Sequence, residues 1–206
     1  MPLGADGVDP MARRTPSPRE RIARLRFPLR GRRVDLVPPG PEHIPEVVRL
    51  LGEPSVARMT LHIPYPYTKR DGRDWVRRTR TNRNSGRALG LSVLRRSDGA
   101  LLGGVGLHDL EEGGTSAEVG YWIGREHRGQ GYAAEAVNLL VRTGFSRLGL
   151  HRIEARVFPG NLASRRLAAR CGFRYEGRLR DEVSKNGRWR ATLLYSRLAT
   201  DPPPRR

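Results

Sequence analysis

Apolar residues along the first third of the chain predict one short strand and two helices. Residues 32–37 alternate apolar and polar positions, which is the period of a strand. Residues 41–51 carry apolar side chains at i, i+3, i+4 and i+7, and this spacing predicts an amphipathic helix. Thr68 is a predicted N-cap, and the helix that it begins is expected to run to about Arg83.

The period then changes to that of strands. Residues 87–95 and 100–107 alternate on either side of the turn at residues 97–99, and together they predict a hairpin. A third strand is expected at residues 117–123, after a turn at Gly113-Gly114.

Helical and strand periods alternate in the last third of the chain. Residues 131–148 place their apolar side chains on one helical face, although Gly144 within this helix is expected to cost about 1 kcal/mol relative to Ala. The further elements follow in order: a strand at 151–158, a helix at 161–171, and a pair of strands at 173–181 and 189–198.

The resulting order, β-α-α-β-β-β-α-β-α-β-β, predicts an α/β fold. Its single mixed sheet is expected to be largely antiparallel and flanked by helices, with parallel pairing at two helical crossovers. Pro, Gly, Ser and Arg dominate residues 1–28, which are predicted to be a disordered basic tail. Residues 29–199 form the predicted domain, and residues 200–206 a second disordered tail.

Composition excludes several classes of protein. The 206 residues contain no apolar run near the roughly 20 residues of a membrane span, and the N-terminal segment lacks the apolar core of a secretory signal. A cytoplasmic protein without membrane contact is therefore expected. Cys171 is the only cysteine, so an intramolecular disulfide and a cysteine-rich zinc site are both excluded. The five histidines show no metal-ligand spacing, and no metal is predicted.

The net charge of +18 has two interpretations. Residues 1–30 hold seven arginines against three acidic residues, so most of the excess lies in the predicted domain. Only Lys69 and Lys185 are lysines, which is typical of a genome-wide preference for arginine. The functional alternative is a polyanionic partner, such as RNA, an acidic peptide or a cofactor with several phosphates.

A strand, a glycine-containing turn and a helix follow one another between Trp122 and Ala133. Gly129 and Gly131 at the helix start would expose several backbone N–H groups in one direction, next to Arg128 and the positive end of the helix dipole. These are the parts of a phosphate cradle, although two glycines before a helix are also typical of an ordinary turn. The segment is neither a Walker loop nor a complete dinucleotide-binding fingerprint.

The sequence resembles the GNAT superfamily of acyl-CoA-dependent N-acetyltransferases over roughly residues 30–198. Within it, the likeness is to the RimJ/RimL-type enzymes, which acetylate the N-terminal amine of ribosomal proteins. Three segments carry the resemblance: Arg128, Gly131 and Ala133 in RGQGYA, the strand Glu118-Val-Gly-Tyr-Trp-Ile123, and Asn161-Leu-Ala-Ser164 followed by Cys171-Gly-Phe173.

The resemblance implies acetyl-CoA as cosubstrate and a GNAT fold, in which a parallel pair of strands splays apart at the cofactor site. The pyrophosphate is expected on the amides of Arg128, Gly129, Gln130, Gly131, Tyr132 and Ala133. The pantetheine arm would lie along the strand that ends at Ile123. A backbone N–H near Trp122 or Ile123 would polarise the thioester carbonyl.

The family pattern also implies side chains for proton transfer. Ser164 is expected to donate a proton to the departing thiolate or to relay one, and Asn161 to contact the cofactor arm. Glu118 and Asp181 are the candidate bases. Some related enzymes have a carboxylate at the position of Val183, and the period of a strand places Asp181, rather than Glu182, on the face of Val183.

Structural alternatives remain open for each of these residues. Asn161 is also a candidate N-cap, and Ser164 is also placed to satisfy the end of a helix. Trp122 and Tyr132 also fit a role in the core, and Cys171 that of a small buried hydrophobe.

The acceptor is expected to be an amine of low pKa, because no strong base is evident. An α-amine has a pKa of about 7.7–8.0 against about 10.4 for lysine, so it is deprotonated several hundred times more often at neutral pH. A ribosomal-protein N-terminus is the first candidate, and a small amine or antibiotic is the alternative. A non-catalytic acyl-CoA-binding or RNA-binding protein on the same scaffold also remains an alternative. The protein is expected to be a monomer or a homodimer.

Overall fold

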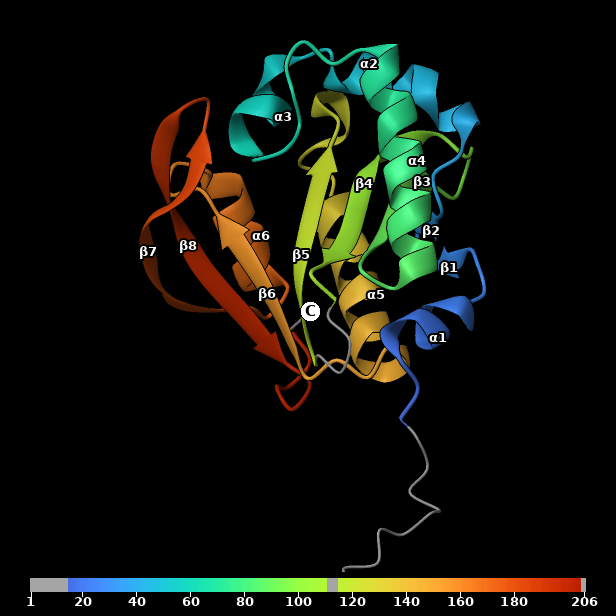
Figure 1. The fold of residues 1–206 in the computed structure, drawn as a ribbon, viewed down its shortest axis with the longest axis vertical. Coiled ribbons are helices and arrows are strands. Elements are labelled where there is room, and N and C mark those ends of the chain that lie inside the picture. Colours follow the sequence, from blue (N-terminus) through green and yellow to red (C-terminus); the bar gives the residue numbers. More distant parts are fainter. Residues whose placement is uncertain (1–14, 111–114, 205–206) are drawn as a thin grey trace, which may run out of the picture.

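In the described part of the chain, residues 15–110 and 115–204 of the computed structural model, eight strands form one sheet (Figure 1). The strands are β1 (Leu29–Arg30), β2 (Val34–Val37), β3 (Leu89–Arg95), β4 (Leu101–His108), β5 (Ser116–Ile123), β6 (Arg152–Val157), β7 (Arg174–Lys185) and β8 (Arg188–Leu198). The helices are α1 (Pro18–Ala23), α2 (Ile44–Leu51), α3 (Pro54–Met59), α4 (Lys69–Ser85), α5 (Tyr132–Arg147) and α6 (Leu162–Arg170), with 3-10 turns η1 (Pro41–His43) and η2 (Arg125–His127).

The order across the sheet is β1-β2-β3-β4-β5-β6-β8-β7. Each neighbouring pair is antiparallel except β5 and β6, which are parallel and joined through α5. The predicted mixed, largely antiparallel α/β fold is therefore confirmed. The second helical crossover runs through α6 from β6 to β7. These two strands do not pair with each other, because β8 lies between them.

Local chemistry explains where the long helices begin and end. The Thr68 hydroxyl accepts a hydrogen bond from the Asp71 N–H, while the Asp71 carboxylate accepts one from the Thr68 N–H, so the two residues form a capping box at the start of α4. The helix ends at Gly86, whose φ of 80° suits glycine. The predicted N-cap and helix are confirmed.

Helices α4 and α5 pack on opposite faces of the sheet (Figure 1). On α4, Thr79 lies over Gly90 of β3. On α5, a Cβ at Gly144 would lie 2.9 Å from Ile153 Cδ1. Gly144 therefore allows α5 to approach the sheet closely, which offsets the intrinsic cost of glycine in a helix.

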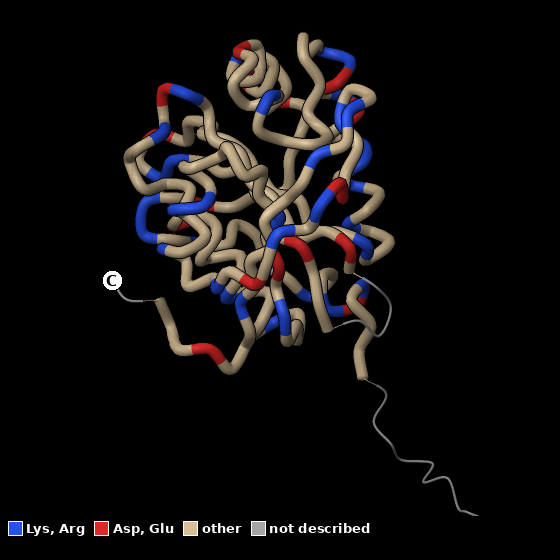
Figure 2. Tube along the Cα trace, turned by 90° about the vertical axis from the view of Figure 1, so that its left-hand side faces the viewer, with Lys and Arg blue, Asp and Glu red and all other residues tan. Residues whose placement is uncertain are grey.

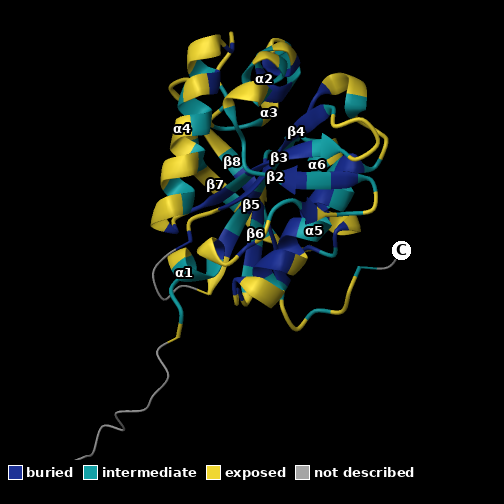
Figure 3. Ribbon diagram, turned by 90° about the vertical axis from the view of Figure 1, so that its right-hand side faces the viewer, coloured by how far each residue is buried: buried dark blue, intermediate teal, exposed yellow. Residues whose placement is uncertain are grey.

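Buried residues gather on α5 and the central strands (Figure 3), and they belong to one hydrophobic cluster. A second cluster lies under α2 and α4 and contains Val47, Leu51, Tyr67 and Leu101. Trp122 of β5 packs against this second cluster. In the described residues no helix is long and apolar enough to cross a bilayer.

The predicted disordered tail at residues 1–28 is wrong for its described part. Residues 18–23 form α1, begun by a Ser17–Glu20 capping box, and Ile22 and Leu25 are buried in the main core. The Arg21 guanidinium also donates to the Leu148 carbonyl at 2.5 Å. The sequence pattern missed α1 because a helix of six residues shows little periodicity; residues 1–14 lie outside the described part.

The predicted C-terminal tail is wrong at its first residues. The Asp201 carboxylate accepts a hydrogen bond from the Leu198 N–H at 2.8 Å and lies 3.1 Å from the Arg174 guanidinium. These contacts fix the chain just beyond β8. Residues 205–206 lie outside the described part.

Replacing Ile22 with Ala tests the docking of α1. We expect the free energy of unfolding to fall by about 2–4 kcal/mol, because the change leaves a cavity in the core. Urea unfolding measures this. Arg24→Ala, on the exposed side of the same segment, is the matched control and should change the free energy by less than about 0.5 kcal/mol. Equal effects of the two changes would contradict the docking of α1.

Candidate functional site

Strands β5 and β6 separate soon after they begin. They pair over residues 116–118 and 152–154, and from Val119 onward their ladder ends while each strand continues (Figure 1). A cavity of about 1160 Å³ opens at this divergence. Its walls come from α2, α4, α6, β3 to β8 and the loop between α3 and α4. The predicted splayed parallel pair is present.

Glycines form the floor of the cavity where three strands lie side by side. Gly90 of β3 pairs with Gly106 of β4, which pairs in turn with Gly120 of β5. Gly104 lies beside the Trp122 indole, and a Cβ at Gly104 would lie 2.6 Å from Nε1. The missing side chains leave room for a ligand to approach the backbone of the sheet.

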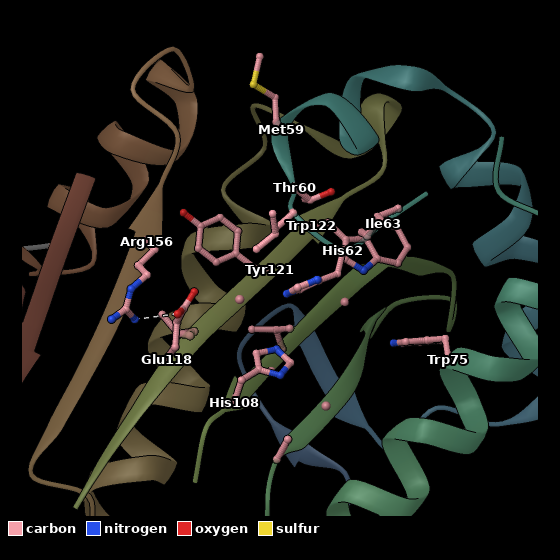
Figure 4. Close-up of a pocket in the computed structure, with 18 of the residues that line it drawn as sticks. Met59, Thr60, His62, Ile63, Trp75, His108, Glu118, Tyr121, Trp122 and Arg156 are labelled. Carbon is pink, nitrogen blue, oxygen red and sulfur yellow. Dashed lines mark hydrogen bonds and ion pairs between the residues drawn. The ribbon is translucent and has the colours of Figure 1, made fainter. Parts of the chain in front are cut away.

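Two histidines enter the cavity from different elements (Figure 4). His108 is the last residue of β4, and its imidazole lies across the glycine floor, 3.0 Å from the position of a Cβ at Gly106. His62 comes from the loop between α3 and α4. Burial lowers the pKa of His108, which therefore favours the neutral imidazole at neutral pH.

Arg156 binds carboxylates that line the cavity. Its Nη1 donates to Glu118 at 2.8 Å, and its Nε donates to Glu182 at 2.9 Å. Glu182 also accepts a short hydrogen bond from the Thr192 hydroxyl. Burial raises the pKa of Glu118 above its usual range, although Arg156 opposes the shift. The predicted base Glu118 thus lies in the cavity but is engaged in an ion pair.

The placement of Asp181 on the cavity face is wrong. Asp181 is exposed and does not line the cavity, whereas Glu182 and Val183 do. The reason is a bulge: the β7–β8 register shifts between Leu179 and Val183, and Asp181 has a φ of 46°. The bulge breaks the two-residue period on which the prediction depended.

Ser164 lies at the opening between β5 and β6, with Tyr121. The Tyr121 hydroxyl donates to the Ser164 carbonyl at 3.4 Å. Burial raises the pKa of Tyr121 to about 12, despite a hydrogen bond with the Ser164 side chain that lowers it. Both hydroxyls therefore remain protonated at neutral pH and line the cavity.

Asn161 is the N-cap of α6. Its side-chain oxygen accepts a hydrogen bond from the Ser164 N–H at 3.1 Å, which confirms the structural alternative for Asn161. Asn161 satisfies one of the N–H groups at this end of the helix, and the capping alternative for the Ser164 hydroxyl stays open.

The predicted phosphate cradle forms a turn at the start of α5. Gly129 has a φ of 75° and Gly131 a φ of 84°, conformations that glycine adopts readily. Gly131, the N-cap, has no side chain, and within the described residues no side-chain hydrogen bond caps the first turn of α5, so the N–H groups that begin with Tyr132 and Ala133 lack a side-chain acceptor there. A 16-residue helix also gives this end a partial positive charge.

Basic side chains border the cradle. Arg128 Nε donates to the Ile123 carbonyl at 3.0 Å and ties the turn to the end of β5. The Gln130 amide donates to the Glu126 carbonyl at 3.0 Å. Arg33 Nη2 lies 3.0 Å from the position of a Cβ at Gly131. The arrangement suits an anion at the helix start, and β5 links it to the cavity.

Other predicted cofactor residues also have structural roles. Tyr132 is buried in the main core, with the Arg33 guanidinium 4.8 Å from its ring centre. Ile123 is buried in the same core, and Ala133 packs against it. Cys171 is fully buried, and burial raises its pKa to about 11, as expected for a small hydrophobe.

Sequence reasoning did not place several side chains that the fold brings to the site: Arg33, His108, Tyr121, Arg156 and Glu182. His108 carried a usable signal. Residues 104, 106 and 108 alternate on one face of β4, and His108 pairs with Glu118 across the ladder. The remaining side chains depend on contacts between distant segments, which spacing alone does not reveal.

Neither the overall distribution of Lys and Arg nor metal chemistry marks out this site. Lys and Arg are spread over many elements in Figure 2 rather than gathered in one place. In the ranges that the structure describes, no three His, Cys, Asp or Glu side chains are grouped as a metal site would require.

Comparisons with known proteins agree with this geometry. Residues 33–174 match the family model described as acetyltransferase (GNAT) domain. YoaA of Bacillus subtilis, described as an uncharacterized N-acetyltransferase, is 42% identical over 110 residues, which are 53% of this chain and 62% of YoaA. The [ribosomal protein uS5]-alanine N-acetyltransferase of Escherichia coli is 35% identical over 88 residues, 43% of this chain and 45% of that protein.

Solved structures of acetyltransferases match this chain over more of its length. Mycobacterium smegmatis RimJ, solved with CoA-disulfide, has a TM-score of 0.74 and 26% sequence identity, covering 81% of this chain and 82% of that one. The chain spans less than two thirds of the length of each curated relative described above.

Proposed function

Because the chain belongs to the GNAT acetyltransferase family, we propose that it transfers an acetyl group from acetyl-CoA to a primary amine. The observation that carries the proposal is the link between β5 and the turn that begins α5. β5 lines the cavity and ends at Ile123, whose carbonyl accepts a hydrogen bond from Arg128 of this turn. The strand and the turn would thus hold a reaction site and an anion site next to each other.

Acetyl-CoA would bind across the separation of β5 and β6. Its pyrophosphate would accept hydrogen bonds from the amides of residues 128–133, beside Arg33 and Arg128. Its pantetheine arm would pair with the edge of β5 beyond Glu118, where the ladder to β6 has ended. The solved RimJ complex with CoA-disulfide supports this location by analogy.

The chemistry then needs polarisation of the thioester and a proton for the thiolate. A backbone N–H near Trp122 or Ile123 would donate to the carbonyl oxygen as charge develops. The Ser164 and Tyr121 residues lie together at the opening, and either hydroxyl can pass a proton to the thiolate and regain one from the amine nitrogen, which loses it as the amide forms.

For the acceptor, we propose the α-amine of a protein N-terminus. Glu118 and Glu182 of the cavity are held by Arg156, so a substrate with an intrinsically low pKa suits the site better than a lysine side chain. The name of the E. coli relative, a ribosomal-protein alanine N-acetyltransferase, supports the same class of acceptor.

Gly131→Val tests the cofactor site. The valine side chain would stand where the diphosphate approaches the amides, so the rise in melting temperature caused by acetyl-CoA should disappear. Gly99→Val is the matched control: Gly99 also has a positive φ, 73°, but lies in the β3–β4 turn with no heavy atom within 4 Å of its Cβ position. It should cost similar stability and keep the ligand-induced shift. A full shift in Gly131→Val would contradict the assignment.

Acceptor choice is tested with two forms of one peptide. The first carries a free N-terminal alanine, and the second has this amine blocked and a free lysine side chain. We expect CoA release at neutral pH to be at least about 10²-fold faster with the first, because far more of its amine is deprotonated. Equal rates, or turnover of small amines alone, would contradict an α-amine acceptor.

Ser164→Ala and Asn161→Ala should have opposite signatures. Ser164→Ala should slow turnover by about 10²-fold or more, because it removes a proton donor, while the melting temperature changes little. Asn161→Ala should lower stability by about 1 kcal/mol, because it removes the N-cap of α6. Turnover and thermal melting on the same preparations measure both effects. Near-normal turnover in Ser164→Ala would assign the proton donor to Tyr121 or water.

A further inference from the structure

We propose that His108 is the base that accepts the proton from the acceptor amine. Its imidazole lies on the glycine floor of the cavity, next to β5. This inference rests on the proposed acetyl transfer. It adds a catalytic side chain from β4, the strand next to the predicted thioester site.

The position of the imidazole is set by backbone geometry. His108 pairs with Glu118 across the β4–β5 ladder, and its side chain extends back over Gly106 of its own strand and over Gly120 of β5. Its Nε2 would lie 3.0 Å from a Cβ at Gly106 and 3.2 Å from one at Gly120. Any larger residue at these positions would displace the ring. Gly120 lies two residues before Trp122 on β5, and the thioester carbonyl is expected near Trp122 or Ile123.

The electrostatic surroundings favour a neutral, accessible imidazole. Burial lowers the pKa of His108, as do His62 from the α3–α4 loop and Arg78 from α4, while Asp109 opposes them. Glu118 faces the same cavity from β5, but Arg156 pairs with it. His108 nevertheless remains open to the cavity. Among the described residues, no hydrogen bond engages its ring nitrogens.

Two of the carboxylates that line the cavity, Glu118 and Glu182, are weaker candidates. Both accept hydrogen bonds from Arg156, so either would have to give up an ion-pair contact to take up a proton. Imidazole starts from a pKa near 6.5, closer to that of an α-ammonium group than the pKa near 4 of a carboxylate. Burial narrows this difference, because it raises the pKa of Glu118 and lowers that of His108. The geometry decides for His108, because no ion pair has to break before its imidazole accepts a proton.

The reaction balances with His108 in this role. The ammonium group of the acceptor gives one proton to the neutral imidazole, and the freed lone pair forms the N–C bond to the thioester carbonyl. The C–S bond then breaks, and its electron pair leaves with the CoA thiolate. The second amine proton passes to this thiolate, directly or through the Tyr121 and Ser164 hydroxyls. The imidazolium finally releases its proton to water.

The pH dependence of kcat/KM for the alanine peptide tests the inference in His108→Gln. We expect a loss of about 10²–10⁴-fold at pH 7, the usual range for acid–base assistance. At pH 9 the α-amine is largely neutral without help, so the loss should shrink to within about tenfold. Wild-type kcat/KM should fall as the pH drops below the lowered pKa of His108, and the variant should lack this limb.

His108→Ala provides a second measurement, because it leaves space for an added base. Imidazole in solution should restore part of its turnover at pH 7, and it should not affect His108→Gln, in which the side chain fills the site. His151→Gln is the matched control: His151 is exposed and outside the cavity, so the wild-type profile should persist. Melting temperature and the acetyl-CoA-induced shift establish that each variant is folded.

The outcomes separate this inference from the proposed acceptor. If the wild-type protein acetylates only a small amine such as ethanolamine, the α-amine proposal fails and the same profiles are recorded on that amine. His108→Gln at the wild-type rate, or a loss that is equal at pH 7 and pH 9, would overturn the role of His108. If instead Glu118→Gln abolishes the fall of kcat/KM at low pH, the base would be Glu118.

Discussion

The early end of the β5–β6 ladder is the constraint on which the site depends. Three residue pairs join these parallel strands, and beyond them the strands diverge. Backbone N–H and C=O groups on the open edge of β5 then lack a strand partner, and such groups must find another one. The strand edge is therefore a template on which an extended ligand can pair, and the cavity follows from the same divergence.

Two features keep the opening between β5 and β6 accessible to a ligand. Between the strands, Arg156 links Glu118 of β5 to Glu182 of β7, so that charges which would otherwise repel one another are neutralised near the divergence. Beneath the opening, the cross-strand row of Gly90, Gly106 and Gly120 keeps the sheet surface low enough for His108 to lie flat on it. Burial then holds this imidazole neutral. The glycine row, the ion pairs of Arg156 and the proposed role of His108 thus all belong to the place where β5 and β6 diverge.

The longer elements were predictable because their cause is local. Periodicity placed α5, and Thr68 marked the start of α4, since a cap is decided by residues only three apart. The glycine turn before α5 was equally local. Short α1 was missed, because docking of Ile22 and Leu25 on a distant core stabilises it rather than propensity.

The details of the site depended on long-range contacts and were less predictable. The bulge at Asp181 reversed which acidic residue of β7 faces the cavity. Arg156 meets Glu118 and Glu182 from sequence separations of 38 and 26 residues. Spacing carries no information on such pairs. The family resemblance predicted a cofactor segment, whereas the side chains around the proposed acceptor site became visible only in the fold.

A crystal structure of the protein with acetyl-CoA tests the central claim most directly. The account predicts a diphosphate within hydrogen-bond distance of the amides of Gly131, Tyr132 and Ala133, and a pantetheine arm between β5 and β6. It also predicts a thioester carbonyl beside Trp122 or Ile123, on the side of β5 that faces the cavity. A nucleotide bound elsewhere, with the space between β5 and β6 empty, would contradict it.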